Sequence, residues 1–235
     1  MEVLADLWRR ATVTTPVLEW QQAAIAGLVA LAVLVLAWKP ARMPLTVCHE
    51  GGHAVVALLT GRRLRGIRLH ADTSGLTRTS GPAGGFGQGL IFFAGYPAPA
   101  LVGLAAAAAV RAGHAAGLLW TIVLLSAVML LGIRNWYGAL AMVVIGGGLA
   151  LTSWYAPPSA LGWVGAGLAW LLLLGAPRVV LEAFRDAKGK GSDADQLAAR
   201  THVPRVVWLV LWLLITVGCL ALGGFWLLPG LPLPR

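Results

Sequence analysis

The chain has 235 residues, of which 58% are hydrophobic and 11% are charged, and its mean hydropathy is +0.78. Soluble domains carry about 25% charged residues, so this composition excludes an ordinary water-soluble globule, a disordered chain and a disulfide-rich secreted domain. The net charge of +9 comes mostly from short segments between apolar runs, which indicates membrane orientation and not a nucleic-acid partner. We therefore predict one all-α polytopic membrane domain over residues 1–235, embedded in a lipid bilayer.

The apolar runs set the number of expected membrane crossings. A helix needs about 17 to 25 apolar residues to cross the hydrocarbon core. Lys39, Pro40, Arg42 and Pro44 form a polar break after the first run. We expect about seven transmembrane helices, at residues 21–38, 45–61, 90–110, 115–133, 136–154, 161–176 and 206–228.

The basic residues then predict the orientation. With seven crossings, 14 basic residues fall on one side of the membrane and 4 on the other. The side richer in Lys and Arg is expected to be cytoplasmic. This predicts a multi-pass plasma-membrane protein with a cytoplasmic N-terminus and an external C-terminus. If residues 39–44 are a bend within one longer insertion, the position of the N-terminus is reversed.

Residues 62–79 are the one stretch with strand character. Leu64, Ile67 and Leu69 alternate in part with basic residues, and residues 72–75 form a turn signal before a second short run. We predict a short cytoplasmic β-hairpin here.

The second apolar run contains the pattern H-E-x-x-H, formed by His49, Glu50 and His53. Histidines at positions i and i+4 lie on one helix face, so both imidazoles can reach a single ion. The intervening glutamate can take a proton from a water held by that ion. Imidazole ligands with an open position favour one Zn²⁺ per chain. The alternative is a polar network inside the bundle without a metal.

Several segments resemble the site-2 protease family of intramembrane zinc metallopeptidases, in its small bacterial branch. They are the H-E-x-G-H motif at residues 49–53, the run at 58–63, Phe-Ala-Gly-Tyr at 93–96, Arg-Asn-Trp-Tyr-Gly at 134–138 and Ser-Asp-Ala at 192–194. The resemblance implies cleavage of peptide bonds in or next to a transmembrane segment of a membrane protein substrate. It implies zinc ligation by His49 and His53, and activation of water by Glu50.

The third zinc ligand has several candidates, because the chain has no Asp-Gly pair of the kind that supplies it in better-known relatives. Asp193 is our first choice, since it matches the Ser-Asp-Ala segment, and Asp195 is the second. Ser192 or Asp193 could instead cap the following helix, with residue 195 or 196 completing a capping box. The other carboxylate and histidine candidates are His70, Asp72, His114, Asp186 and His202.

The resemblance also gives Asn135 a role in orienting the substrate backbone or steadying the oxyanion, whereas a turn or helix cap is the plainer interpretation. The predicted function is thus a zinc-dependent intramembrane endopeptidase. The alternative is a catalytically inactive metal-binding membrane protein that acts as a scaffold or binds a partner helix. A catalytic zinc site keeps an open position, whereas a structural site is closed by four protein ligands.

Overall fold

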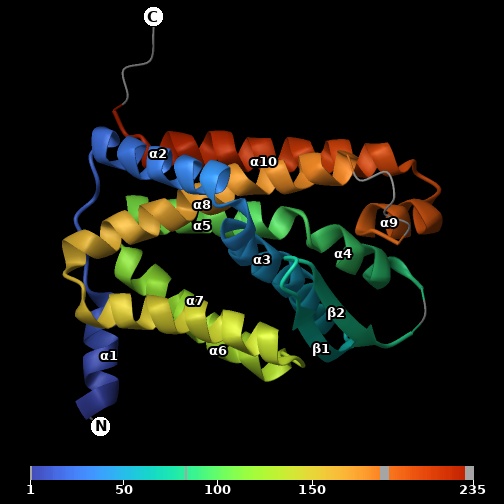
Figure 1. Ribbon diagram of the computed structural model, residues 1–235, viewed down its shortest axis with the longest axis horizontal. Coiled ribbons are helices and arrows are strands. Elements are labelled where there is room, and N and C mark those ends of the chain that lie inside the picture. The colour runs from blue at the N-terminus through green and yellow to red at the C-terminus, as the bar shows by residue number, and fades with distance from the viewer. Residues whose placement is uncertain (1, 83, 186–190, 231–235) are drawn as a thin grey trace, which may run out of the picture.

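The computed structural model describes residues 2–82, 84–185 and 191–230. Within these ranges the chain forms ten helices and one two-stranded antiparallel sheet (Figure 1). In chain order the elements are α1 (Glu2–Thr12), α2 (Trp20–Leu36), α3 (Trp38–Leu59), β1 (Arg63–Leu69), β2 (Gly75–Ser80), α4 (Phe86–Ala94), α5 (Pro97–Arg111), α6 (Ala115–Gly132), α7 (Trp136–Tyr155), α8 (Pro158–Arg185), α9 (Asp193–Thr201) and α10 (Arg205–Leu227). The prediction of a helical membrane protein with one short hairpin is confirmed, apart from the number of spans.

Four of the described helices, α6, α7, α8 and α10, are each long and apolar enough to cross a membrane. Two further pairs of consecutive helices are long and apolar enough to cross a membrane only when each pair is counted as one segment, and each pair is bent at the break between its helices. α2 and α3 meet at 106°, and α4 and α5 meet at 62°. The described chain thus has four candidate spans, or up to six if each bent pair is one span, and the predicted number of seven is not confirmed.

The first bend lies at Ala37 and not at residues 39–44, where the sequence predicted a break. Because α3 begins at Trp38, Pro40 falls in its first turn, where a backbone N–H has no helical partner and proline costs little. Pro44 lies inside the same helix. The helix therefore continues through the charged segment and carries the H-E-x-x-H motif on its second half.

The second bend divides the apolar run at 90–110, which the sequence predicted as a single span. α4 ends at Ala94, and α5 begins with Pro97, which loses nothing at the first helical position because its missing N–H would be unpaired there. Gly95 and Tyr96 form the turn between the two helices. This turn reaches the predicted metal ligands, as described below.

The N-terminal segment and the hairpin lie at opposite ends of the bundle (Figure 1). Thr15 donates a backbone hydrogen bond of 2.8 Å to Gly113, just before α6, whereas Arg134, just after α6, donates one of 2.9 Å to Ile67 in β1. The chain therefore passes once from one end of the bundle to the other through α2 and α3. The N-terminal segment and the hairpin thus lie at opposite ends of the described bundle, as they would if residues 39–44 belong to one bent insertion.

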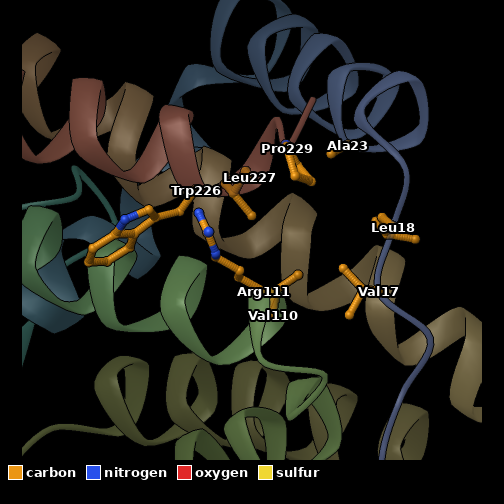
Figure 2. Close-up of a pocket in the computed structure, with 8 residues that line it drawn as sticks. All are labelled: Val17, Leu18, Ala23, Val110, Arg111, Trp226, Leu227 and Pro229. Atoms are coloured by element: carbon orange, nitrogen blue, oxygen red, sulfur yellow. The ribbon is translucent and has the colours of Figure 1, made fainter. Parts of the chain in front are cut away.

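The end of α10 lies with the N-terminal segment. In Figure 2, Val17 and Leu18 lie near Val110 at the end of α5, Leu227 at the end of α10, and Pro229 just after α10. The start of α10 lies at the other end of the bundle, where Arg205 donates to the carbonyl of Ala183 near the end of α8. α10 therefore runs the length of the bundle, with residues 228–230 at the end opposite the hairpin.

The longest described helix, α8, forms the centre of the bundle against α2, α5 and α10. Small residues allow these helices to approach closely, as expected for helices packed in lipid. A Cβ on Gly103 of α5 would lie 3.0 Å from side-chain atoms of Leu172 and Leu173. The buried indole of Trp170 donates to the carbonyl of Ala23 in α2 at 2.9 Å. This packing makes a rigid frame, against which α3, α4, α9 and the hairpin form the candidate site.

The hairpin agrees with the predicted range of 62–79. β1 pairs with β2 from Arg63 with Ser80 to Leu69 with Gly75, and the register shifts between Leu64 and Gly66. The outer edge of β1 is bridged by Ile133. In the part of the chain that the structure describes, no strand pairs with the outer edge of β2. The sheet therefore has one covered edge and one open edge.

Candidate metal centre and its cleft

Three side chains from two helices converge on one point. His49 and His53 project from the same face of α3, and Asp193 is the first residue of α9. The Nε2 atoms of the histidines are 3.0 Å apart, and Asp193 Oδ2 lies 3.1 Å from His49 Nε2 and 3.2 Å from His53 Nε2. Among the described residues, this group of three could hold a metal ion. The structure thus brings together the two predicted histidines and the first-choice third ligand.

The donor atoms have the chemistry that a cation requires. His53 Nδ1 donates to the carbonyl oxygen of Ile91 at 2.6 Å, so in the neutral ring the lone pair of Nε2 points toward His49 and Asp193. Donors about 3.3 Å apart form the edges of a tetrahedron with bonds of 2.0–2.1 Å, the length typical for zinc. The observed separations are close to that value, and three protein ligands leave a fourth position for water. The residues present therefore fit Zn²⁺.

The alternative role of Asp193 as a helix cap is filled by neighbouring residues. Ser192 is the N-cap of α9, and its hydroxyl accepts from the N–H of Asp195 at 3.3 Å. Asp195 completes the capping box and also forms an ion pair with Arg205. The carboxylate of Asp193 is therefore not needed as a cap. Burial raises the pKa of this carboxyl, but hydrogen bonds with His49 and His53 outweigh it and hold the pKa below its usual range.

The other candidate ligands lie elsewhere or have other partners. His70 and Asp72 are in the hairpin turn, where both contact Ser74. His114 caps α6 at the opposite end of the bundle, and His202 ends α9 in a left-handed conformation. Asp186 lies outside the described residues. None of the four described candidates belongs to the group of converging donors.

Glu50 is buried beside this group, with 4% of its surface exposed, and faces the hairpin. The hydroxyl of Thr77 in β2 donates to Glu50 Oε2 at 2.6 Å. Gly75 packs directly on the same carboxylate, so that an added Cβ would overlap Glu50 Oε1. Glu50 thus lies beside the candidate metal ligands but is not one of the converging donors, as expected for a general base.

The hairpin turn is fastened to the first half of α3. Thr73 has a left-handed backbone with φ of +68°. Its hydroxyl accepts from Arg42 at 2.9 Å, and its carbonyl accepts from Thr46 at 2.8 Å. These bonds place β2 along α3, which is why Thr77 and Gly75 can reach Glu50.

The turn between α4 and α5 packs against the other side of His49 and His53, a role that the segment at 93–96 did not by itself indicate. A Cβ on Gly95 would lie 2.5 Å from His53 Nε2 and 2.6 Å from His49 Cε1. Tyr96 meets His49 edge-on at a ring separation of 4.9 Å and stacks on Trp212 of α10 at 4.4 Å. The signal available in the sequence was the Gly-Tyr-Pro step inside an apolar run.

A cleft of about 830 Å³ opens onto Glu50, the two histidines and Asp193. One wall is the open edge of β2, of which five consecutive residues, 75–79, line the cleft. The facing wall comes from α4 and the start of α9, with Gln88, Phe92 and Gln196. The cleft is therefore an open groove between a free strand edge and two short helices, and it leads to the candidate metal centre.

Asn135 does not line this cleft. Its amide makes two hydrogen bonds with the backbone of Leu69, donating to the carbonyl at 2.7 Å and accepting from the N–H at 3.2 Å. Together with the bridge of Ile133 to Ile67, it extends the sheet beyond the outer edge of β1. Its contact in this structure is thus with the hairpin, and a role in substrate binding stays a prediction.

Comparison with known proteins gives one match. The family model described as Peptidase M50B-like matches residues 22–223, which include every residue of the candidate centre. No curated protein and no solved structure matches the chain.

Proposed function

The chain belongs to the Peptidase M50B-like family, and from that premise we propose that it is a zinc-dependent endopeptidase that cleaves membrane proteins in or next to a transmembrane segment. The observation that carries the proposal is the convergence of His49, His53 and Asp193 beside Glu50 at the inner end of a cleft. A donor set of two imidazoles and one carboxylate with an open position is typical of catalytic zinc sites. It favours an enzyme over a metal-stabilised scaffold, which would close the site with a fourth ligand.

The reaction divides between the ion and the protein. Zn²⁺ held by the three residues would act as a Lewis acid on the scissile carbonyl. Glu50 accepts a proton from the attacking water and passes it to the nitrogen of the leaving amine. Its neighbours Thr77 and Gly75 keep the carboxylate in one orientation, which a general base requires. Ile91 fixes the ring of His53 through Nδ1.

The substrate must present an extended backbone, because the peptide bonds of a helix are already hydrogen-bonded and shielded. The open edge of β2 supports binding by strand addition, in which backbone hydrogen bonds hold the segment and alternate side chains enter neighbouring pockets. Residues 75–79 line the cleft along that edge. A substrate segment that unwinds from its helix and pairs with β2 would pass beside Glu50.

We propose that the hairpin end of the bundle is cytoplasmic. Among the described residues, nine arginines belong to that end and three to the other, while Arg42 and Arg178 lie between the ends and share Glu182. Basic residues concentrate on the cytoplasmic side. The nine are Arg62, Arg63, Arg65, Arg68, Arg78, Arg134, Arg185, Arg200 and Arg205, and the three are Arg9, Arg10 and Arg111. In the plasma membrane this orientation keeps residues 228–230 outside, as predicted, and places the N-terminal segment there as well.

The test uses the purified full chain in lipid vesicles. Wild type is expected to bind about one zinc per chain and to cleave a model substrate that has a single transmembrane segment. Glu50→Gln should keep the zinc and lose cleavage. Asp193→Asn should lose zinc, whereas its matched control Asp195→Asn should keep it, since Asp195 completes the capping box of α9 and is not one of the converging donors.

Two results would contradict the proposal. Cleavage that persists in Glu50→Gln would remove the assigned general base. Zinc binding without cleavage of any membrane substrate by the wild type would favour the non-catalytic alternative.

A further inference from the structure

The two walls of the cleft differ in charge. Arg65 and Arg78, both exposed, line it on the hairpin side, and they are its only Lys or Arg residues among those described. The facing wall of α4 and α9 contributes neutral side chains around Asp193, such as Gln88, Phe92 and Gln196. A substrate in this groove would therefore meet positive charge on one side only.

An irregularity in β1 brings the two arginines together. Leu64 pairs with Thr79 and Gly66 pairs with Arg78, so Arg65 is the extra residue of a β-bulge. A bulge places two residues opposite one and redirects a side chain. Arg65 is thereby displaced from the regular alternation of β1 and lies beside Arg78 at the cleft. Arg63 and Arg68 are also exposed residues of β1 but do not line the cleft.

The charges of Arg65 and Arg78 are not neutralised within the described part of the chain. Neither forms an ion pair with a described carboxylate, and Arg65 donates only to the hydroxyl of Ser80, at 2.7 Å. The two carboxylates of the cleft have partners already, Glu50 with Thr77 and Asp193 with the histidines. The accessible charge along the edge of β2 is therefore positive.

We propose that Arg65 and Arg78 select substrates with acidic side chains in the segment that pairs with β2, close to the scissile bond. The inference rests on the proposed endopeptidase function and adds the chemical class of the substrate. Side chains of a segment added to β2 would alternate between its two faces, and those beside Arg78 would be cross-strand neighbours of a cation. Asp or Glu at that position is attracted, and Lys or Arg is repelled.

A protein segment is favoured over a lipid headgroup because the arginines share the cleft with Glu50 and the metal ligands. Arginines that only attract anionic lipid have no need to line a catalytic groove, and a bulge that turns one of them toward it would serve no purpose. Anionic lipid is nevertheless the main competing explanation, and the experiment separates the two.

The experiment compares three model substrates that differ only in three residues on the cytoplasmic side of the transmembrane segment, which are Glu, Gln or Lys. Each is cleaved by the full chain in vesicles of phosphatidylcholine, with or without phosphatidylglycerol. The enzymes are wild type, R65E/R78E and the matched control R63E/R68E, which changes the same charge on the same hairpin outside the cleft. Zinc content and thermal stability are measured for each variant to exclude misfolding.

Accessible charge pairs across strands each change binding by a few-fold. We therefore expect wild type to cleave the Glu substrate about tenfold more efficiently, as kcat/KM, than the Lys substrate. R65E/R78E should reverse that order, and R63E/R68E should keep it. A reversal of preference cannot arise from partial unfolding, because unfolding lowers cleavage of all substrates together.

Equal cleavage of the three substrates by wild type would overturn the charge selection while leaving the endopeptidase intact. Cleavage of none of them would instead contradict the proposed function. If R65E/R78E lowered cleavage of all three equally, and only in vesicles with phosphatidylglycerol, the arginines would be lipid contacts and the inference would be wrong.

Discussion

Replacement of Gly95 by alanine should weaken metal binding although Gly95 is not a ligand. The backbone of Gly95 is right-handed helical, with φ of −60° and ψ of −56°, which alanine adopts without strain. The added methyl group would nevertheless lie 2.5 Å from His53 Nε2 and 2.6 Å from His49 Cε1. Because ordinary contacts of a Cβ begin near 3.4 Å, one or both imidazoles must move by nearly 1 Å.

A displacement of that size exceeds what a zinc site tolerates, since ligand distances hold to within about 0.2 Å. Overpacking of a well-packed site costs about 1–3 kcal/mol. If that cost falls on the metal-bound state, it corresponds to about a 5- to 150-fold loss in zinc affinity, at about 1.4 kcal/mol for each factor of ten. Cleavage at limiting zinc should fall by the same factor and recover in part when zinc is raised.

The assay is competition for zinc with a chelator of known affinity, with the protein in detergent. Gly51→Ala is the matched control, because Gly51 is in the same helix as the ligands and its added Cβ would meet nothing within 4 Å. Alanine is favoured over glycine in a helix by about 1 kcal/mol, so this variant should bind zinc as tightly as wild type. Wild-type zinc affinity in Gly95→Ala would refute the close approach of the α4–α5 turn to the ligands.

Three further variants separate the metal centre from the base and from the hairpin. Gly75→Ala should keep its zinc and lose cleavage, because the new methyl group displaces the carboxylate of Glu50; loss of zinc would show that the two groups are not independent. Thr77→Val should lower kcat by about 10- to 150-fold with little change in KM, since a hydrogen bond to a charged group contributes about 1.5–3 kcal/mol. Thr77→Ser should restore most of that kcat, and a lack of rescue would assign Thr77 to packing. Asn135→Ala should raise hydrogen exchange in residues 63–80, because it leaves two backbone groups of buried Leu69 unpaired; unchanged exchange would contradict its role in holding the hairpin.

Local patterns predicted those parts of the site that a few neighbouring residues define. The spacing of His49 and His53 fixes both rings on one helix face wherever the helix lies. The partial alternation and turn signal of residues 62–79 likewise predicted the hairpin, which forms at Arg63–Leu69 and Gly75–Ser80. Asp193 required the resemblance to a family, because nothing near it in the sequence distinguishes a ligand from a helix cap.

The bend between α4 and α5 was not predicted, and the bend between α2 and α3 was expected at residues 39–44, not at Ala37, for different physical reasons. Hydropathy sums the transfer free energy of an apolar run, but it carries no information on the direction of the helix axis. Residues 90–110 were therefore predicted to form one straight span. The break at residues 39–44 was expected because two prolines and two basic residues are unfavourable in a membrane-spanning helix. Pro40 instead falls in the first turn of α3, where proline is tolerated, and Arg42 is neutralised by Glu182 and bonded to Thr73.

The residues that bond to the H-E-x-x-H motif could not be predicted from the sequence, because they lie on other elements of the fold. Ionisable groups inside a membrane protein are costly unless they are paired, and here each pairs with a different element. His53 bonds to Ile91 in α4, Glu50 to Thr77 in β2, and both histidines to Asp193 in α9. These partners lie 27 to 144 positions away along the chain. Because the ligand shell and the base are supported by separate elements, loss of the Asp193 carboxylate should remove metal, whereas changes at Gly75 or Thr77 should impair catalysis and leave the metal bound.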